Sequence, residues 1–142
     1  MDMANWYGAS RTNYFRVTNE EKYEELIGRL SCEDEIHDFS YEKDGEIWHG
    51  FGAYDSISFL VDEDDDEEWY YIGHFVDELS EILNENDVFI YMCSGNEKLR
   101  YVTGEVIVAT KTEKTHWDME TYAVEKAKEL MNDSNFTTRV CY

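Results

Sequence analysis

The stretch Trp69–Leu83 reads WYYIGHFVDELSEIL, and its apolar residues recur with the period of an α-helix. A helix brings residues three or four positions apart onto one face, so this pattern predicts an amphipathic helix packed against a core. The elements on either side are predicted from their own patterns below. The residues that make the helical pattern are Ile72, Phe75, Val76, Leu79, Ile82 and Leu83.

A second helix is predicted near the start of the chain. Thr18-Asn19-Glu20-Glu21 matches a capping box, in which Thr18 and Glu21 would satisfy free backbone N–H groups. Tyr14–Val17, directly before it, is predicted as a short strand. The apolar residues of this helix recur at helical spacing and are Tyr23, Leu26, Ile27 and Leu30.

Three strands are predicted between the two helices, at Ile36–Tyr41, Glu46–Gly52 and Ser56–Val61. The first two are separated by a segment containing Asp44-Gly45, a pair that suits a tight hairpin turn. We therefore expect the three to form an antiparallel meander.

Further strands and a third helix are predicted in the second half of the chain. Strands are predicted at Val88–Cys93 and Leu99–Thr110, with a turn at Ser94-Gly95-Asn96, and Asp118 is placed to cap a third helix. Phe136–Cys141 is predicted as the last strand. The order β-α-β-β-β-α-β-β-α-β predicts a single α+β domain over residues 1–142, with about three helices packed through their apolar residues on a face of one largely antiparallel sheet. The third helix carries its apolar residues at Met119, Tyr122, Ala123, Ala127, Leu130 and Met131.

Negative charge is the extreme feature of the composition. The chain has 33 Asp plus Glu and 12 Lys plus Arg, a net charge of −21. Residues 19–87 hold 24 acids and three bases, whereas residues 98–142 hold seven of each. A surface that is acidic only for solubility would be acidic throughout, so this asymmetry indicates a dedicated acidic face.

Residues 62–68 are seven acids in a row, and we expect them to form a solvated loop just before the Trp69–Leu83 helix. Carboxylates spaced over such a face imitate DNA phosphates and would bind a basic, nucleic-acid-binding protein. Trp69 and Tyr70 would add an aromatic anchor. The residues predicted to contact the partner are Glu20, Glu21, Glu24, Glu25, Glu33, Asp34, Glu35, Asp62, Glu63, Asp64, Asp65, Asp66, Glu67, Glu68, Trp69 and Tyr70.

Catalytic chemistry has little support in the sequence. The histidines lack metal-ligand spacing, and the acidic run departs from a calcium loop because Glu67 stands at the glycine position and Gly73 at the final glutamate position. No nucleotide-binding or serine-nucleophile motif occurs. We therefore expect no cofactor and no enzymatic activity, and the negative face argues against direct nucleic-acid binding.

One resemblance adds to this interpretation. Ala4-Asn5-Trp6-Tyr7-Gly8, followed by Arg11 and Asn13-Tyr14-Phe15-Arg16-Val17, resembles the opening of small acidic proteins carried by phages and mobile elements of Gram-positive bacteria. The acidic balance is similar to that of anti-restriction and anti-CRISPR proteins. The resemblance implies an inhibitor of a bacterial defence protein, either a CRISPR effector or a restriction enzyme.

Two alternatives stay open at this point. An immunity or antitoxin protein that caps a basic nuclease toxin would use the same charge in a more compact patch. An enzyme would need a divalent metal held by acids near Asp62–Asp66 with a histidine such as His49. No apolar run reaches the roughly 18 residues of a membrane span, and the first residues lack a signal pattern, so we expect a cytoplasmic monomer or homodimer.

Overall fold

The computed structural model describes residues 6–63 and 66–141, and it confirms the predicted α+β class. This part of the chain contains three helices: α1 (Glu20–Ile27), α2 (Gly73–Ile82) and α3 (Met119–Met131). The strands of the same part pair antiparallel throughout. They are β1 (Trp6–Thr12), β2 (Leu30–Ser31), β3 (His37–Asp38), β4 (Tyr41–Lys43), β5 (Glu46–Trp48), β6 (Phe51–Ala53), β7 (Ser58–Glu63), β8 (Asp66–Tyr71), β9 (Phe89–Glu97), β10 (Tyr101–Ala109) and β11 (Lys114–Asp118).

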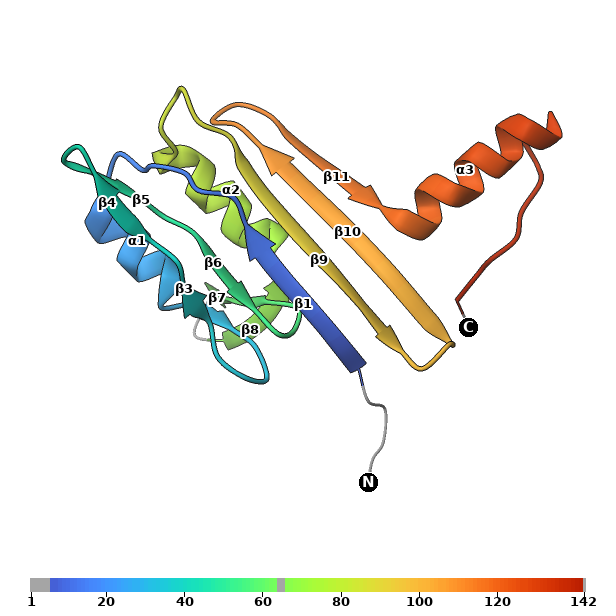
Figure 1. The fold of residues 1–142 in the computed structure, drawn as a ribbon, viewed down its shortest axis with the longest axis horizontal. Helices are drawn as coiled ribbons and strands as arrows, with labels where there is room; N and C mark the ends of the chain where they lie inside the picture. Colours follow the sequence, from blue (N-terminus) through green and yellow to red (C-terminus); the bar gives the residue numbers. More distant parts are fainter. Residues whose placement is uncertain (1–5, 64–65, 142) are drawn as a thin grey trace.

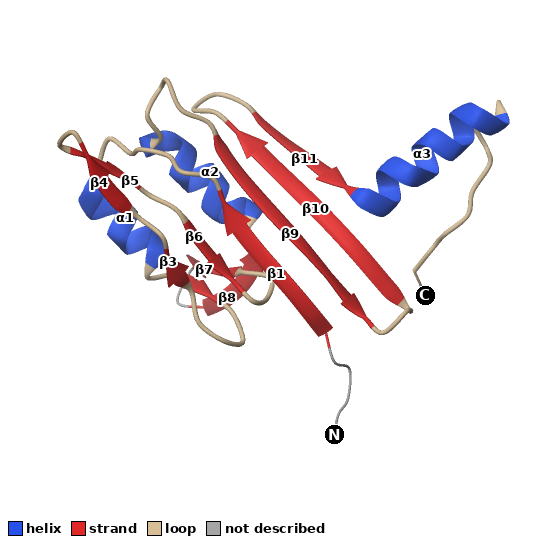
Figure 2. Ribbon diagram, in the orientation of Figure 1, coloured by secondary structure: helices blue, strands red, loops and turns tan. Residues whose placement is uncertain are grey.

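The largest sheet has six strands in the order β11-β10-β9-β1-β6-β3. Its centre is the long β9–β10 hairpin, whose register pairs Phe89 with Ala109 and Glu97 with Tyr101. The first strand of the chain, β1, lies between β9 and β6 and so joins the two halves of the sequence. Figure 1 and Figure 2 show α1 and α2 behind this sheet, while α3 extends beyond β11.

Two smaller sheets, β2-β7-β8 and β4-β5, hold the remaining strands. The β4–β5 hairpin turns at Asp44 and Gly45, whose φ angles of 54° and 80° are those of a tight hairpin turn, so the predicted turn is confirmed. The predicted meander is wrong, because its strands divide among three sheets. One cause lies at His49, which leaves the β4–β5 hairpin and exchanges two backbone hydrogen bonds with Phe15.

The core lies between one face of the six-stranded sheet and the two helices α1 and α2. Phe75 of α2 is fully buried, and its ring meets those of Phe51, Phe59 and Phe89 at centroid distances of 5.7, 5.6 and 6.1 Å. Leu26 adds the buried face of α1. Burying each such side chain contributes about 1.5–3 kcal/mol, so this aromatic cluster is the main source of stability.

The acidic run is not a loop, which corrects the prediction. Asp62 and Glu63 end β7, and β8 begins at Asp66, so the run lies at the tip of a hairpin; Asp64 and Asp65 are outside the described residues. The helix expected from Trp69 begins only at Gly73, and β8 separates the run from it. The run of Trp69, Tyr70 and Tyr71 explains the error, because aromatic residues favour strands and β7 offers them a pairing partner.

Helix α1 begins one residue later than predicted. Asn19 is the N-cap, and its side chain accepts a hydrogen bond from the Lys22 backbone N–H. The Thr18 hydroxyl instead donates to the carbonyl of Ile82, so the predicted capping role of Thr18 is wrong. An Asn side chain at the N-cap stabilises a helix as well as Thr does, and Thr18 is left to tie α1 to the end of α2.

The first strand and the second turn also differ from the prediction. Phe15 and Val17 form only isolated bridges, and the continuous strand β1 lies earlier in the chain, where pairing on both sides outweighs weak strand formers. Ser94–Asn96 continues β9 instead of turning. The turn falls after it, at Lys98, whose φ is 51°.

Helix α3 is capped by Asp118, as predicted, through a hydrogen bond that its carboxylate accepts from the Thr121 N–H. Its environment is not the predicted one, since none of its residues, all of which are described, is buried. Strand β11 was not predicted, and 136–141 is not a strand. That tail runs back along α3, where the Glu120 carboxylate accepts hydrogen bonds from the Val140 and Cys141 N–H groups.

Candidate binding surfaces

The charge asymmetry of the sequence is also an asymmetry in space. Residues 19–87, here called the acidic lobe, form α1, α2 and strands β2 to β8 at one end of the molecule. Residues 98–141, here called the neutral arm, form β10, β11, α3 and the C-terminal tail at the other end. The net charge is −21 in the lobe and zero in the arm.

The acids of α1 divide into two kinds. Glu20 lies 2.8 Å from His49, and Glu25 pairs with Lys22 and Arg29 at 3.0 and 2.8 Å. Glu21 and Glu24 are exposed and form no ion pair with any described residue. Glu21 and Glu24 therefore match the predicted partner-binding role better than Glu20 and Glu25, because their carboxylates are available to an external cation.

Arg29 is the basic residue that holds the lobe together. Its guanidinium pairs with Glu25 of α1 and Glu78 of α2, donates to the Leu60 carbonyl of β7, and lies 4.4 Å from the centroid of the Phe59 ring. Partial burial raises the pKa of Glu25, but hydrogen bonds from Lys22 and Arg29 outweigh this and hold it below its usual value. One cation thus fastens both helices to the β7–β8 hairpin.

The remaining acids lie toward the two ends of β7. The Asp55 carboxylate accepts a hydrogen bond from the Glu33 N–H, which fixes the exposed residues 33–35 near the start of β7. The acidic run lies at the other end of that strand, about 17 Å away along an extended backbone. Arg29 pairs with the strand between these two positions, so the α1 acids are close to the middle of the series.

The β7–β8 register brings acids of the run opposite one another. Asp62 pairs with Glu67, and Glu63 pairs with Asp66. Like charges at directly opposed positions destabilise a hairpin, and a bound cation would relieve this. The side chains of residues 62–70 lie outside the described part of the structure, so the aromatic anchor predicted at Trp69 and Tyr70 stays a prediction.

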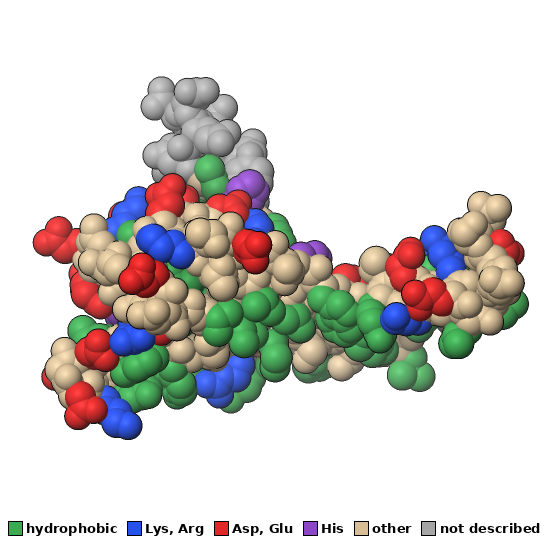
Figure 3. Space-filling model, turned by 90° about the horizontal axis from the view of Figure 1, so that it is seen from above, with side chains coloured by type: hydrophobic (Ala, Val, Ile, Leu, Met, Phe, Trp, Pro, Cys, Tyr) green, Lys and Arg blue, Asp and Glu red, His purple; other side chains and the backbone are tan. Residues whose placement is uncertain are grey.

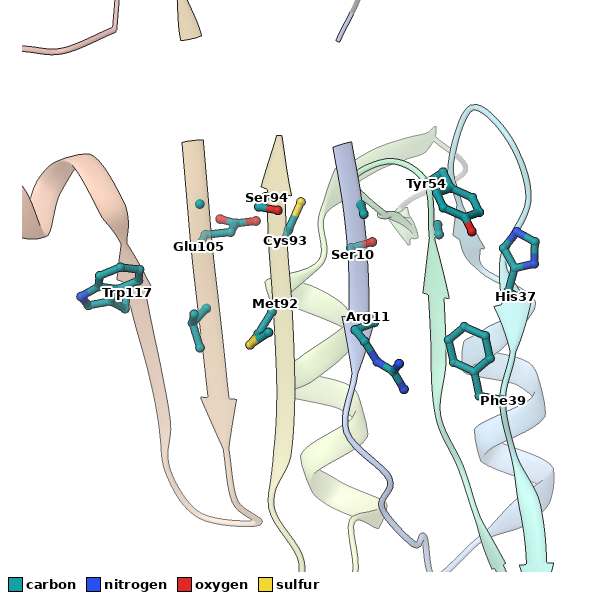
Figure 4. Close-up of a pocket in the computed structure, with 14 residues that line it drawn as sticks. Ser10, Arg11, His37, Phe39, Tyr54, Met92, Cys93, Ser94, Glu105 and Trp117 are labelled. Atoms are coloured by element: carbon teal, nitrogen blue, oxygen red, sulfur yellow. The ribbon is translucent and has the colours of Figure 1, made fainter. Parts of the chain in front are cut away.

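A second surface, which the sequence did not predict, lies on the other face of the six-stranded sheet. Along β9, Phe89, Tyr91 and Cys93 point into the core, while Met92 is half exposed on the opposite face. This face of the six-stranded sheet is here called the open face, and a groove of about 550 Å³ crosses it (Figure 4). Its lining includes Arg11, Phe39, Met92, Val106 and Trp117. Figure 3 shows hydrophobic side chains in a band along this side of the molecule.

The sequence did hold a signal for this surface. Val88–Cys93 is apolar at every position, and such a run is typical of a strand with apolar surroundings on both faces. The structure covers one face of β9 with α2 and leaves the other uncovered by described residues. Arg11 is the cation of the open face, and its guanidinium lies 5.0 Å from the centroid of the Phe39 ring.

No described group of three His, Cys, Asp or Glu side chains is arranged to hold a metal ion. His49, named above as a metal ligand of the alternative enzyme, is buried and contacts Glu20 and Ser40. Burial raises the pKa of the Cys93 thiol, which makes it a poorer nucleophile. Among the described helices, none has the length and apolar character to cross a membrane.

Comparison of the chain with protein-family models, with curated proteins and with solved structures finds no match. The resemblance in residues 4–17 therefore stays a prediction. The functional argument rests on the two surfaces themselves: the acidic lobe and the open face.

Proposed function

We propose that the acidic lobe binds a basic, nucleic-acid-binding protein by occupying the surface that would otherwise hold DNA. The protein is then an inhibitor, and the partner class we infer is a bacterial defence protein, a CRISPR effector or a restriction enzyme. The observation that carries this proposal is the concentration of the entire net charge of −21 in one lobe of the fold.

The spacing of the acids supports an extended mode of binding. Double-stranded DNA carries about one charge per 1.7 Å, so the ~17 Å length of β7 corresponds to about ten phosphates. The α1 acids, residues 33–35 and the acidic run together supply 14 carboxylates. Glu20 and Glu25 already have internal partners, which lowers the number available to a partner toward the DNA value.

The same spacing distinguishes this proposal from the immunity-protein alternative. A protein that caps one toxin active site needs a compact acidic patch, whereas these acids follow the length of a hairpin and the helix beside it. Charge at this density steers a basic partner and speeds association, and salt weakens both effects. Strong salt dependence is therefore part of the proposal.

A pull-down from a bacterial lysate tests the proposal. The tagged protein is used at low and at high salt, and bound proteins are identified by mass spectrometry. We expect salt-sensitive recovery of a nucleic-acid-binding defence protein. Recovery of a toxin alone would favour the immunity alternative, and recovery of no basic protein would refute the proposal.

Two matched variants locate the surface. E21Q/E24Q removes two exposed lobe acids that pair with no described residue, and E113Q/D133N removes two exposed acids from the neutral arm. Both variants change the net charge equally. Recovery should fall several-fold for the first and stay unchanged for the second, and an equal loss would show that only total charge matters.

A further inference from the structure

Helix α3 is largely exposed, with only partial burial at Glu120, Val124, Ala127 and Lys128. None of its 13 residues, each described, is buried, and it extends from the end of β11 away from the body of the fold (Figure 1). Leu130 and Met131 are 89% and 58% exposed, and Tyr122 is 48% exposed. Large apolar residues with such exposure at the end of a projecting helix call for a covering surface.

Four apolar residues of α3 form one stripe, which the exposed Tyr122 and Met131 flank on either side. Met119, Ala123, Ala127 and Leu130 follow one another at spacings of three or four and so share a face of the helix. The opposite face carries charged and polar residues. An isolated helix of this length is marginal in water, so an amphipathic stripe of this kind is expected to gain its stability from packing.

The first turn of α3 is held by its own chain. Met119 lies against Gly104 of β10, and the rings of Trp117 and Tyr122 have centroids 5.4 Å apart. Glu120 fixes the C-terminal tail through Val140 and Cys141. These contacts set the direction in which α3 projects, whereas Leu130 near its other end stays 89% exposed.

The open face supplies a surface of the complementary kind. Met92 and Trp117 are 52% and 40% exposed and line its groove of about 550 Å³. Figure 3 shows the hydrophobic band of the body continuing toward the α3 arm. An apolar stripe and an apolar groove therefore occur in one chain.

The total surface area indicates how much is left uncovered. The chain exposes 9392 Å². A compact monomer of its mass, 16.9 kDa, would expose about 7,700 Å². The excess is on the order of 1,000 Å² or more, which equals or exceeds the roughly 800 Å² that each partner buries in a standard interface.

Charge decides which copy or partner can approach this side. Two copies of a chain with a net charge of −21 repel one another, and most strongly through their lobes. The open face has one arginine, Arg11, and one glutamate, Glu105, in its lining, and the neutral arm has no net charge. Glu105 is already engaged with Tyr71 and His116. A second copy therefore meets least repulsion here, whereas a strongly basic partner gains least here.

We propose that the chain forms a two-fold homodimer in which α3 of each copy lays its apolar stripe across the open face of the other. Such an isologous contact uses both unsatisfied surfaces at once and closes without further assembly. Helices α1 and α2 and the β7–β8 hairpin of each lobe lie on the other side of the sheet and face outward in this dimer, so their acids stay available to a basic partner. The dimer goes beyond the proposed function and does not depend on it.

Sedimentation analysis over a range of concentrations tests the dimer. We expect the wild-type chain to have twice the mass of 16.9 kDa and to dissociate on dilution. L130E/M131E should raise the dimer dissociation constant at least about 100-fold, because two apolar side chains per copy would be buried with charge. A wild-type chain that stays monomeric at its highest soluble concentration overturns the proposal.

Two further variants keep the result interpretable. T121E/K128Q makes the same change in net charge on the polar face of α3 and should leave the dimer intact. M92E changes the open face instead of the helix and should also give monomers, with an unchanged far-UV circular dichroism spectrum as the check on folding. A dimer that survives both L130E/M131E and M92E would place the interface elsewhere and refute the assignment.

Discussion

Replacing Arg29 by methionine should destabilise the fold more than the loss of any exposed charge. The substitution keeps an apolar stem over Phe59 but removes the hydrogen bond to the Leu60 carbonyl and the contacts with Glu25 and Glu78. It leaves two carboxylates close together in a lobe that has only two other bases. The perturbation therefore acts where the lobe's self-repulsion is strongest.

The magnitude follows from these contacts. A hydrogen bond from a charged donor to a carbonyl contributes about 1.5–3 kcal/mol. The Glu25 and Glu78 pairs are partly exposed and contribute about 0.3–1 kcal/mol each, and the contact with the Phe59 ring adds about 0.5–1 kcal/mol. We expect R29M to lower the free energy of unfolding by about 3 kcal/mol, a large part of the 5–15 kcal/mol typical of a domain.

Urea unfolding of R29M and K22M provides the comparison. Lys22 also pairs with Glu25 and Glu78, at 3.0 and 3.7 Å, but it is more exposed than Arg29, and the hydrogen bond to the Leu60 carbonyl of β7 comes from Arg29. K22M loses the same charge and should lower the unfolding free energy by less than about 1 kcal/mol. Equal effects of the two substitutions would refute the view that Arg29 fastens the lobe through its specific contacts.

Two other predictions concern stability. The hydrogen bond from Arg16 holds the pKa of Asp87 below its usual 3.8. Asp87 therefore stabilises the fold above that pH, and this contribution is lost as the pH falls through the lower pKa of the folded state. The melting temperature of D87N should differ most from that of the wild type at neutral pH and converge with it in acid. G52A should lower the unfolding free energy by at least about 2 kcal/mol, because its Cβ would lie 2.6 Å from the Ser10 carbonyl oxygen. The Cβ of G104A would make ordinary contacts of 3.5 Å or more, so G104A should change the unfolding free energy by less than about 1 kcal/mol. Similar chemical denaturation curves for the two variants would contradict the packing argument.

Much of the fold follows from local patterns in the sequence. The helical period ending at Leu83, the Asp44-Gly45 pair and the Asp118 cap each specify a structure within a few residues, and each is present. The α+β class follows from the order of such elements. Predictions of this kind succeed because the determining interactions are short in sequence.

The errors arise where pairing with a distant segment determines the local structure. The acidic run was predicted as a loop because its own residues disfavour a packed strand, yet Asp62, Glu63 and Asp66 extend a hairpin whose stability comes from the apolar and aromatic residues that follow. The first continuous strand is β1 and not the predicted 14–17, because β9, some 80 residues away in sequence, pairs with β1. Pairing over such separations cannot be inferred from propensity alone.

The candidate surfaces were also predicted only in part, because some of their features depend on contacts between distant elements. The density of acids in residues 19–87 is visible in the sequence, but the internal pairing of Glu20 and Glu25 is not, because their partners lie on other elements. The apolar run Val88–Cys93 indicated a strand with apolar surroundings on both faces, but which of the two faces is left uncovered depends on the packing of distant elements. The apolar stripe of α3 was interpreted as a core face for the same reason.

The central claim is that the acidic lobe occupies a DNA-binding surface, and competition for a captured partner tests it most directly. The partner is immobilised with the protein bound, and a DNA duplex that the partner binds is added in increasing amounts. The proposal predicts mutually exclusive binding, in which the duplex displaces the wild-type protein and displaces E21Q/E24Q at lower concentration. A stable ternary complex of partner, duplex and protein would contradict it.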